Sequence, residues 1–401
     1  MPSSINDLLS SEEISSIRLP IETALTLPAS AFTDDRFYQL EIENIYKKHW
    51  IAAQFESEIG SPGDIKPFDV CDIPLLAVRG QDGKLRVFHN ICPYDGCLAA
   101  IDPAQALQEI VTPYHGWTYD LEGKLIKTPY WDGSEEGNLD ALAGKQVDLI
   151  PVNCETFLNT LFINLSDQPE PFAQYIAPLF RAMDEYDLAG SKPGLDKNGN
   201  VYTSIACVNT NWKTFFENAC INVLHENFVH AVYNASPEVP RIKSDGISSF
   251  NNIIDEKFMA LGYNRLDFQN TYPPVEAPHM GKDPAKEPEG ETFGTLYPNF
   301  YVSASSQFIE TAIVLPKGPG VAESNVCYHF QADVAVAEEA VEERRGVADG
   351  FYGAFMEDAR IAEAVQKARK SPVYSQHFYA PFWDAMHHYF SNMILDDLEG
   401  G

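Results

Sequence analysis

Short apolar runs separated by turn residues occupy the chain from about residue 50 to residue 165. Two of these runs, Ile73–Val78 and Leu85–Asn90, flank the sequence Gly80-Gln81-Asp82-Gly83, which is typical of a hairpin turn. Tight turns between short β-prone segments let each strand fold back on the strand before it. The pattern therefore predicts a small antiparallel β domain in this part of the chain.

The second half of the chain mixes strand-like and helix-like stretches. Four segments have the character of strands: Val201–Asn209, Leu296–Ser303, Phe308–Leu315 and Asn325–Val334. Trp212–Tyr233 reads as helical at its start, and residues 264–295 are rich in Pro, Gly and charge, which indicates a long surface loop. Val336–Lys370 has no proline and is predicted to be largely helical. Three glycines near its middle favour a break into two helices: Gly346, Gly350 and Gly353.

Composition and charge exclude several classes of protein. The chain has 401 residues, of which 45% are apolar, so it is long enough for two packed domains. The net charge of −30 opposes binding to nucleic acid or to an anionic membrane. No apolar run is long enough for a membrane span, and no secretory signal is expected at the N-terminus. Seven scattered cysteines suit free thiols in a reducing cytoplasm.

Two loops in the β-rich region carry a cysteine and a histidine in a recognisable frame. Asn90–Tyr119 reads NICPYDGCLAAIDPAQALQEIVTPYHGWTY. It resembles the cluster-binding loops of Rieske oxygenase α subunits, which carry C-x-H in the first loop and C-x-x-H in the second. At the four positions that bind the [2Fe–2S] cluster in that family, this chain has Cys92, Tyr94, Thr112 and His115.

The replaced residues argue against a cluster. A Rieske centre holds one iron with two thiolates and the other with two imidazoles. Thr112 is a very poor iron ligand, and the phenol of Tyr94 would have to ionise first. Cys97 could be offered as a substitute thiolate, although a buried small apolar residue is the simpler interpretation. We therefore expect no [2Fe–2S] cluster, and a pocket filled by side chains that include Tyr94.

A second motif is complete. Asn211–His230 reads NWKTFFENACINVLHENFVH, which resembles the segment that carries the two histidine ligands of mononuclear iron in the same family. The resemblance makes His225 and His230 iron ligands. Residues 357–366 read EDARIAEAVQ, like the family segment with the third ligand, and this makes Asp358 the carboxylate. Two imidazoles and one carboxylate form the facial triad of non-haem Fe(II) oxygenases, with open positions for dioxygen and substrate.

Helical spacing supports the Asp358 assignment, because Asp358, Ala362 and Val365 share one stripe that is predicted to face the sheet. Two asparagines also match functional positions. Asn218 corresponds to an asparagine close to the iron, although it could instead satisfy local backbone groups. Asn222 stands where the family has an acidic residue between the iron site and the cluster of a neighbouring subunit. An amide there carries no charge, which matches the altered cluster loops.

The resemblance implies an α+β fold with three regions. Residues 1–45 would form an N-terminal arm and helix, and residues 46–165 a Rieske-like antiparallel β domain with incomplete cluster ligands. Residues 166–401 would form the catalytic non-haem iron domain, a curved antiparallel sheet covered by helices. Trimers, or mixed hexamers with a cluster-bearing paralogue, are also implied.

Three functions remain open at this point. The first is O2-dependent hydroxylation or demethylation of a small organic substrate at Fe(II), with electrons from another subunit, an electron-transfer protein or a reductase. The second is a stand-alone non-haem iron enzyme that works without a Rieske cluster. The third is a non-catalytic or regulatory partner of an intact α subunit. The sequence does not identify the substrate.

Overall fold

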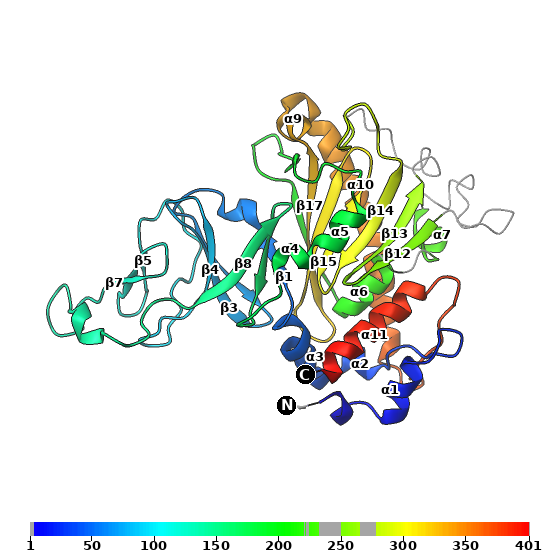
Figure 1. Cartoon of the computed structure of the whole chain (residues 1–401), viewed down its shortest axis with the longest axis horizontal. Helices are drawn as coiled ribbons and strands as arrows, with labels where there is room; N and C mark the ends of the chain where they lie inside the picture. Colours follow the sequence, from blue (N-terminus) through cyan, green and yellow to red (C-terminus); the bar gives the residue numbers. More distant parts are fainter. Residues whose placement is uncertain (1–3, 220, 222–223, 232–249, 265–277, 401) are drawn as a thin grey trace. The chain divides into compact units, whose positions relative to one another are not determined.

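The chain folds into two compact units, Ala52–Pro169 and a larger unit made of Met1–Ile51 with Glu170–Gly401. Both units combine antiparallel sheets with helices or turns, so the predicted α+β class is confirmed (Figure 1). The computed structural model describes residues 4–219, 221, 224–231, 250–264 and 278–400. Among the helices in these ranges, none has both the length and the hydropathy needed to cross a bilayer.

The smaller unit contains a six-stranded sheet with strand order β1-β9-β8-β4-β3-β2 and a three-stranded sheet with order β5-β6-β7. The strands are β1 (Ile51–Phe55), β2 (Ile65–Val70), β3 (Ile73–Arg79), β4 (Leu85–His89), β5 (Ile110–Val111), β6 (Thr118–Tyr119), β7 (Leu125–Lys127), β8 (Pro151–Phe157) and β9 (Thr160–Asn164). Two 3-10 turns accompany them, η3 (Glu56–Ile59) and η4 (Leu139–Leu142).

The predicted hairpin is present between β3 and β4. Arg79 pairs with Leu85 across the turn, and Gly83 has a φ of 76°, which a residue without a Cβ adopts at low cost. The loop of residues 90–97 follows β4, and the loop of residues 112–117 connects β5 to β6. The two loops with the cysteine and histidine frame therefore both leave strands of this unit.

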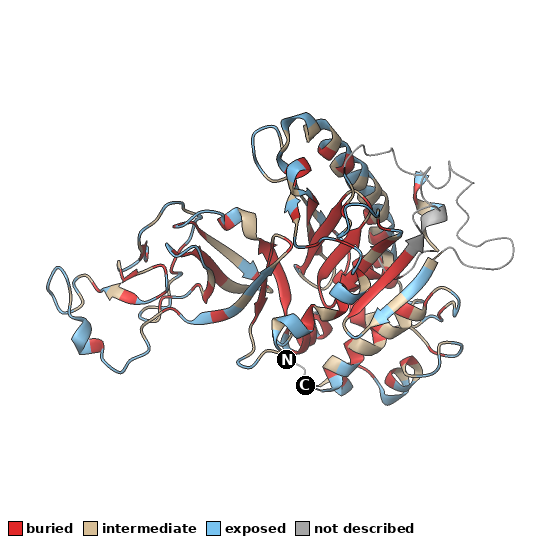
Figure 2. Ribbon diagram, turned by 45° about the horizontal axis from the view of Figure 1, so that its top comes forward, coloured by how far each residue is buried: buried red, intermediate tan, exposed pale blue. Residues whose placement is uncertain are grey.

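The larger unit is built on an eight-stranded antiparallel sheet with the order β10-β17-β16-β15-β14-β13-β12, in which β11 also pairs with β17. The strands are β10 (Ser191–Pro193), β11 (Thr203–Val208), β12 (Phe250–Asp255), β13 (Phe258–Asn264), β14 (Gly290–Leu296), β15 (Phe300–Ala304), β16 (Ile309–Pro316) and β17 (Ala322–Gln331). All residues of β15 and β16 are buried, so the middle of this sheet is core (Figure 2).

Helices pack on this sheet and around its end (Figure 1). They are η1 (Ile5–Asp7), α1 (Ser11–Ile17), α2 (Ser30–Thr33), α3 (Asp35–Glu41), the π-helix η2 (Ile42–Tyr46), α4 (Phe172–Tyr175), α5 (Ala177–Ala182), α6 (Trp212–Ala219), α7 (Glu226–Val229), α9 (Ala332–Val336), η6 (Glu338–Ala340), α10 (Val341–Arg369) and α11 (Ala385–Glu399). The longest, α10, begins with Glu342 and Glu343 and ends near Lys367 and Arg369, an order that complements the helix dipole.

The predicted break at the three glycines is wrong, because α10 is one helix of 29 residues. Gly346, Gly350 and Gly353 all lie on its exposed side, where no side-chain packing is lost. Each glycine costs about 1 kcal/mol in helix propensity, and contacts on the opposite face offset that cost. The predicted loop of residues 264–295 is also too long, since β14 begins at Gly290.

The N-terminal segment, expected as a separate arm of residues 1–45, packs within the larger unit. Glu41 at the end of α3 is fully buried and lies 2.5 Å from Lys213 Nζ on α6, and it also accepts a hydrogen bond from Trp212 Nε1. Gln366 Nε2 on α10 donates to the carbonyl of Phe32 at 2.8 Å. The start of the chain thus holds both α6 and α10.

Candidate metal centre

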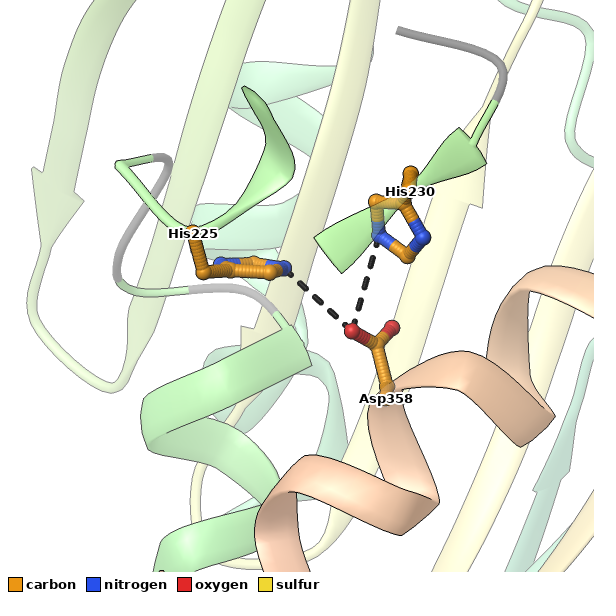
Figure 3. A group of neighbouring side chains, drawn as sticks. All are labelled: His225, His230 and Asp358. Atoms are coloured by element: carbon orange, nitrogen blue, oxygen red, sulfur yellow. Dashed lines mark ion pairs between the residues drawn. The ribbon is translucent and has the colours of Figure 1, made fainter. Parts of the chain in front are cut away.

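Three predicted ligands converge in the larger unit. His225, His230 and Asp358 each offer a ligand atom, and these atoms lie within 4.8 Å of one another. Asp358 Oδ1 is 3.5 Å from Nε2 of each imidazole, and Figure 3 shows the three side chains pointing toward one another. Within the described ranges this is the only group of three or more His, Cys, Asp or Glu ligand atoms so arranged.

The shortness of α7 makes this convergence possible. His225 and His230 are five residues apart, and in an unbroken α-helix five residues would leave about 140° between their side chains. Here α7 covers only Glu226–Val229. The backbone N–H groups of Phe228 and Val229 donate hydrogen bonds to the carbonyl of His225. The histidines therefore lie at the two ends of a single turn, with ring centroids 5.5 Å apart.

Glu357, which precedes Asp358 on α10, is a site residue that the sequence analysis did not single out. Its Oε2 lies 3.0 Å from His230 Nδ1. A carboxylate on one ring nitrogen orients the imidazole and leaves the other nitrogen for a metal. His230 Nε2 is the nitrogen that faces Asp358. The only signal in the sequence was the adjacency of the two acidic residues.

The chemistry of the three side chains fits a divalent transition metal. Asp358 Oδ1 is buried and accepts no hydrogen bond from any residue that the structure describes, which is costly for a carboxylate oxygen unless a cation occupies the space beside it. The side chains of His225, His230 and Asp358 are 18%, 9% and 21% exposed, so the site is largely but not completely shielded from solvent. Two imidazoles and one carboxylate are the donor set of non-haem Fe(II) centres.

Other predicted positions near the metal centre differ in outcome. Asn218 is half-buried in the last turn of α6, and Asn222 lies outside the described residues. The predicted stripe on α10 needs correction, because Val365 is 36% exposed and Gln366 is buried instead. At 3.6 residues per turn Val365 lies about 20° and Gln366 about 80° from Asp358 around the helix, so the spacing alone does not select Gln366. Its burial comes from a tertiary contact, because its Nε2 donates to the carbonyl of Phe32.

The four cluster positions of the smaller unit present a different donor set. They provide one thiol, one imidazole, one phenol and one hydroxyl, whereas a Rieske cluster takes two thiolates and two imidazoles, so the residues present do not fit it. Thr112 is 2% exposed, and its buried hydroxyl has no hydrogen-bond partner. Cys92 is fully buried, with Sγ 3.5 Å from the hydroxyl of Tyr119.

Aromatic side chains gather around the same loops. The Tyr94 ring stacks on Trp117 with centroids 4.7 Å apart, yet Tyr94 remains 44% exposed and so covers the loops without being enclosed. His115 Nδ1 lies 2.6 Å from Asp95 Oδ2. Cys97 is half-buried rather than buried, and its backbone N–H donates to Asp95.

Two family models match the chain. The model "Ring hydroxylating alpha subunit (catalytic domain)" matches residues 183–400, which is more than half of the chain, and the model "Rieske [2Fe-2S] domain" matches residues 49–141. The second match covers residues 52–141 of the smaller unit, the part that contains Tyr94 and Thr112.

Several known proteins are similar. The glycine betaine monooxygenase oxygenase subunit of Pseudomonas aeruginosa is 29% identical over 49% of this chain and 42% of its own length, so less than half of that relative is matched. Choline monooxygenase of Spinacia oleracea is 24% identical over 97% of this chain and 81% of the relative. A solved quaternary ammonium Rieske monooxygenase shares the fold, with a TM-score of 0.72, 18% identity and coverage of 93% of this chain and 95% of that one. The family match and the common fold show that this chain belongs to the ring-hydroxylating α subunits of Rieske-type oxygenases.

Proposed function

We propose that this chain is an oxygenase α subunit that hydroxylates or demethylates a small organic substrate with O2 at a mononuclear Fe(II) ion. The observation that carries the proposal is the buried Oδ1 of Asp358, which lies 3.5 Å from Nε2 of both His225 and His230 and accepts no hydrogen bond from the described residues. His225, His230 and Asp358 would hold the ion. Bound Fe(II) supplies the one-electron and dioxygen chemistry of this class of centre.

The chain's own residues prepare the site for that ion. Glu357 holds the imidazole of His230 in one orientation, and the ends of α7 fix the spacing of the two histidines. The carboxylate reaches the site from α10, which packs against both α6 and α7. A centre on packed elements keeps its ligand geometry better than a centre on free loops.

Electrons are proposed to come from outside the chain, because we propose that the smaller unit holds no [2Fe–2S] cluster. Support comes from Tyr94 and Thr112 at two ligand positions. The two residues that remain at ligand positions contact protein groups instead. Cys92 contacts Tyr119, and His115 contacts Asp95. A cluster-bearing paralogue in a trimer or mixed hexamer, or a separate electron-transfer protein or reductase, would then serve the iron. A cytoplasmic location is part of the same proposal, since the described cysteines are free thiols.

The names of the relatives suggest a substrate class. Glycine betaine, choline and quaternary ammonium compounds appear in the names of the proteins compared above. All of these carry a nitrogen with a permanent positive charge. A substrate of this kind is proposed for this chain, whose net charge of −30 favours the approach of cations.

Metal analysis of the anaerobically purified chain tests the proposal. We expect about one iron per chain and essentially no acid-labile sulfide. Absence of iron after reconstitution with Fe(II) would overturn the oxygenase assignment and favour a non-catalytic partner subunit. Substrate oxidation by the isolated chain without any added electron donor would instead favour a stand-alone iron enzyme.

A further inference from the structure

A buried cluster of titratable side chains lies where α6, α10 and α11 meet. Glu217 on α6 places its Oε2 2.6 Å from Nη2 of Arg369, the last residue of α10, and its Oε1 3.0 Å from Nε2 of His387 on α11. The side chains of Glu217, Arg369 and His387 are only 9%, 7% and 14% exposed. The two carboxylate oxygens of one glutamate thus join three helices inside the larger unit.

Arg369 is held from more than one direction. Its Nη2 donates to Glu217, and its Nη1 donates to the hydroxyl of Thr214, which lies three residues earlier on α6. Its guanidinium also lies over the ring of Phe32 on α2, with Cζ 3.5 Å from the ring centroid. Thr214 and Glu217 share one face of α6, so the planar guanidinium engages both along that face. A shift of α10 along α6 would break both hydrogen bonds at once.

Glu217 is ionised in this setting. Burial alone would raise the pKa of its carboxyl group, but the neighbouring Arg369 and His387 outweigh burial and hold that pKa well below its usual range. A buried ion pair is costly to separate, because each charge left alone would be desolvated without compensation. The contact between Glu217 and Arg369 therefore resists displacement of α10 relative to α6.

Two further hydrogen bonds tie the same helices together. The backbone N–H of Asn211, directly before α6, donates to Oε1 of Gln366 at 3.1 Å, and the hydroxyl of Thr210 donates to the carbonyl of Ala362 at 3.2 Å. We call this row of contacts the α6–α10 seam. Its residues, all of them buried, are Thr210, Asn211, Thr214 and Glu217 on one side and Ala362, Gln366 and Arg369 on the other.

The seam connects the two segments that carry proposed ligands. Helix α6 precedes His225, and α10 carries Asp358 on the same unbroken helix as Arg369. Phe215 of α6 also contacts Phe355, three residues before Asp358, with ring centroids 6.0 Å apart. A continuous helix carries a displacement at one end along its length. Ligand sets require placement to within about 0.5 Å, so a small movement at the seam reaches the metal centre as a change of geometry.

We infer that Glu217 and Arg369 are positioning residues of the metal centre, which set the separation of Asp358 from the two histidines through the α6–α10 seam. They act through the helices that they join and do not touch the ion. The inference rests on the proposed function, because it takes His225, His230 and Asp358 as the ligands.

Titration of the metal-free full chain with Co(II), followed by visible absorption, tests this role. Arg369→Lys keeps the positive charge, but an ammonium group does not span Thr214 and Glu217 as the planar guanidinium does. We expect Co(II) affinity to fall by at least about threefold. The absorption intensity of the bound ion should change as well, because it depends on the coordination geometry.

Arg344→Lys is the matched control. Arg344 is also a buried arginine of α10, but its guanidinium donates to the carbonyls of Leu195, Val334 and Ala337 rather than to α6. Both lysine variants should lower the Tm of the metal-free chain. Only Arg369→Lys should also reduce the rise in Tm that a fixed excess of Co(II) produces, since that rise reports metal affinity.

Milder variants cover the case in which Arg369→Lys fails to fold. Glu217→Gln keeps the shape of the side chain and removes its charge, and Thr214→Val removes only the hydroxyl group that Arg369 contacts. Both should lower Co(II) affinity in the same direction. Wild-type affinity and spectrum in the folded variants, or equal losses of affinity in Arg344→Lys and Arg369→Lys, would overturn the positioning role alone. A wild-type chain that binds no Co(II) would overturn the proposed function together with it.

Discussion

His230 Nδ1 lies 3.0 Å from the carboxylate of Glu357, the residue directly before Asp358 on α10. One turn of this helix therefore supplies both a proposed ligand and a carboxylate that contacts another proposed ligand. This pairing leads to the first prediction about the metal centre.

Glu357→Gln should weaken metal binding without removing it. An amide does not hold the imidazole of His230 with the strength of a carboxylate, and losses of outer partners of this kind cost about 10–100-fold in metal affinity. Titration of the metal-free chain with Co(II), followed by its visible absorption, measures the change. Glu342→Gln, in the exposed first turn of the same helix, serves as the control. Unchanged Co(II) affinity in Glu357→Gln would show that the 3.0 Å contact does not orient a ligand.

Asp358→Ala and His225→Ala should each abolish iron occupancy and cost the metal-free protein little stability. Two remaining ligands form only a weak site. Asp358 Oδ1 has no hydrogen bond to lose, so we expect the unfolding free energy of metal-free Asp358→Ala to change by less than about 1 kcal/mol. Iron content and thermal unfolding of the metal-free variants measure both effects. Variants that retain full iron would disprove the ligand assignment.

The double substitution Tyr94→His with Thr112→Cys should allow a [2Fe–2S] cluster to form on reconstitution. It restores two thiolates and two imidazoles to loops that still leave β4 and β5. The buried hydroxyl of Thr112 has no partner, so a thiol can replace it without breaking a hydrogen bond. Electron paramagnetic resonance of the reduced protein and sulfide content report the cluster. Each single variant is the control and should remain without a cluster, and a double variant that also lacks one would mean that the loops no longer hold the cluster frame.

Glu310→Gln should stabilise the protein at pH 8 and have little effect at pH 5. The unfolded chain releases the Glu310 proton near pH 4.5, whereas burial raises the pKa of Glu310 in the folded chain to about 8. The folded state therefore binds more protons in this window, and the contribution of Glu310 to stability is present below pH 4.5 and is lost as the pH rises to 8. Gln cannot ionise, so the gain at pH 8 is about 2–4 kcal/mol.

Thermal or denaturant unfolding at the two pH values measures this gain as the difference between variant and wild type. Glu323→Gln should show no comparable dependence on pH, because its half-buried side chain already lies near Lys317. Destabilisation by Glu310→Gln at pH 8 would show that the ionised carboxyl is satisfied in the fold.

The candidate metal centre was predictable because its signal is local. His225 and His230 belong to one short segment and Asp358 to a second, and the resemblance of both segments to the family indicated the triad. Glu310 gave no such signal, since only the register of β16 with β15 and β17 places it beside Ser303 and Tyr328. An environment made by strand pairing cannot be read from periodicity.

Errors in predicting α10 have a related cause. Gly346, Gly350 and Gly353 weaken a helix by propensity, but the contacts of the buried face decide whether the helix continues. Tertiary contacts also decide whether Val365 or Gln366 belongs to the buried stripe of α10. A residue three or four positions after Ala362 can lie on the same helical face. Helix propensity therefore predicted the type of element correctly. The length of α10 and the face that it buries depend on tertiary contacts.

The buried pair of Glu41 and Lys213 joins groups 172 residues apart in the chain, and Gln366 reaches back to Phe32 over 334 residues. During synthesis, the Glu41–Lys213 contact cannot form before α6 has been made, and the Phe32–Gln366 contact cannot form before α10 has been made. Asp358, the proposed third ligand, lies on the later of these helices. With the proposed ligand set, metal binding is therefore a late event in the biogenesis of this chain, and a ribosome-bound fragment that stops before Asp358 would have two histidines but no complete site.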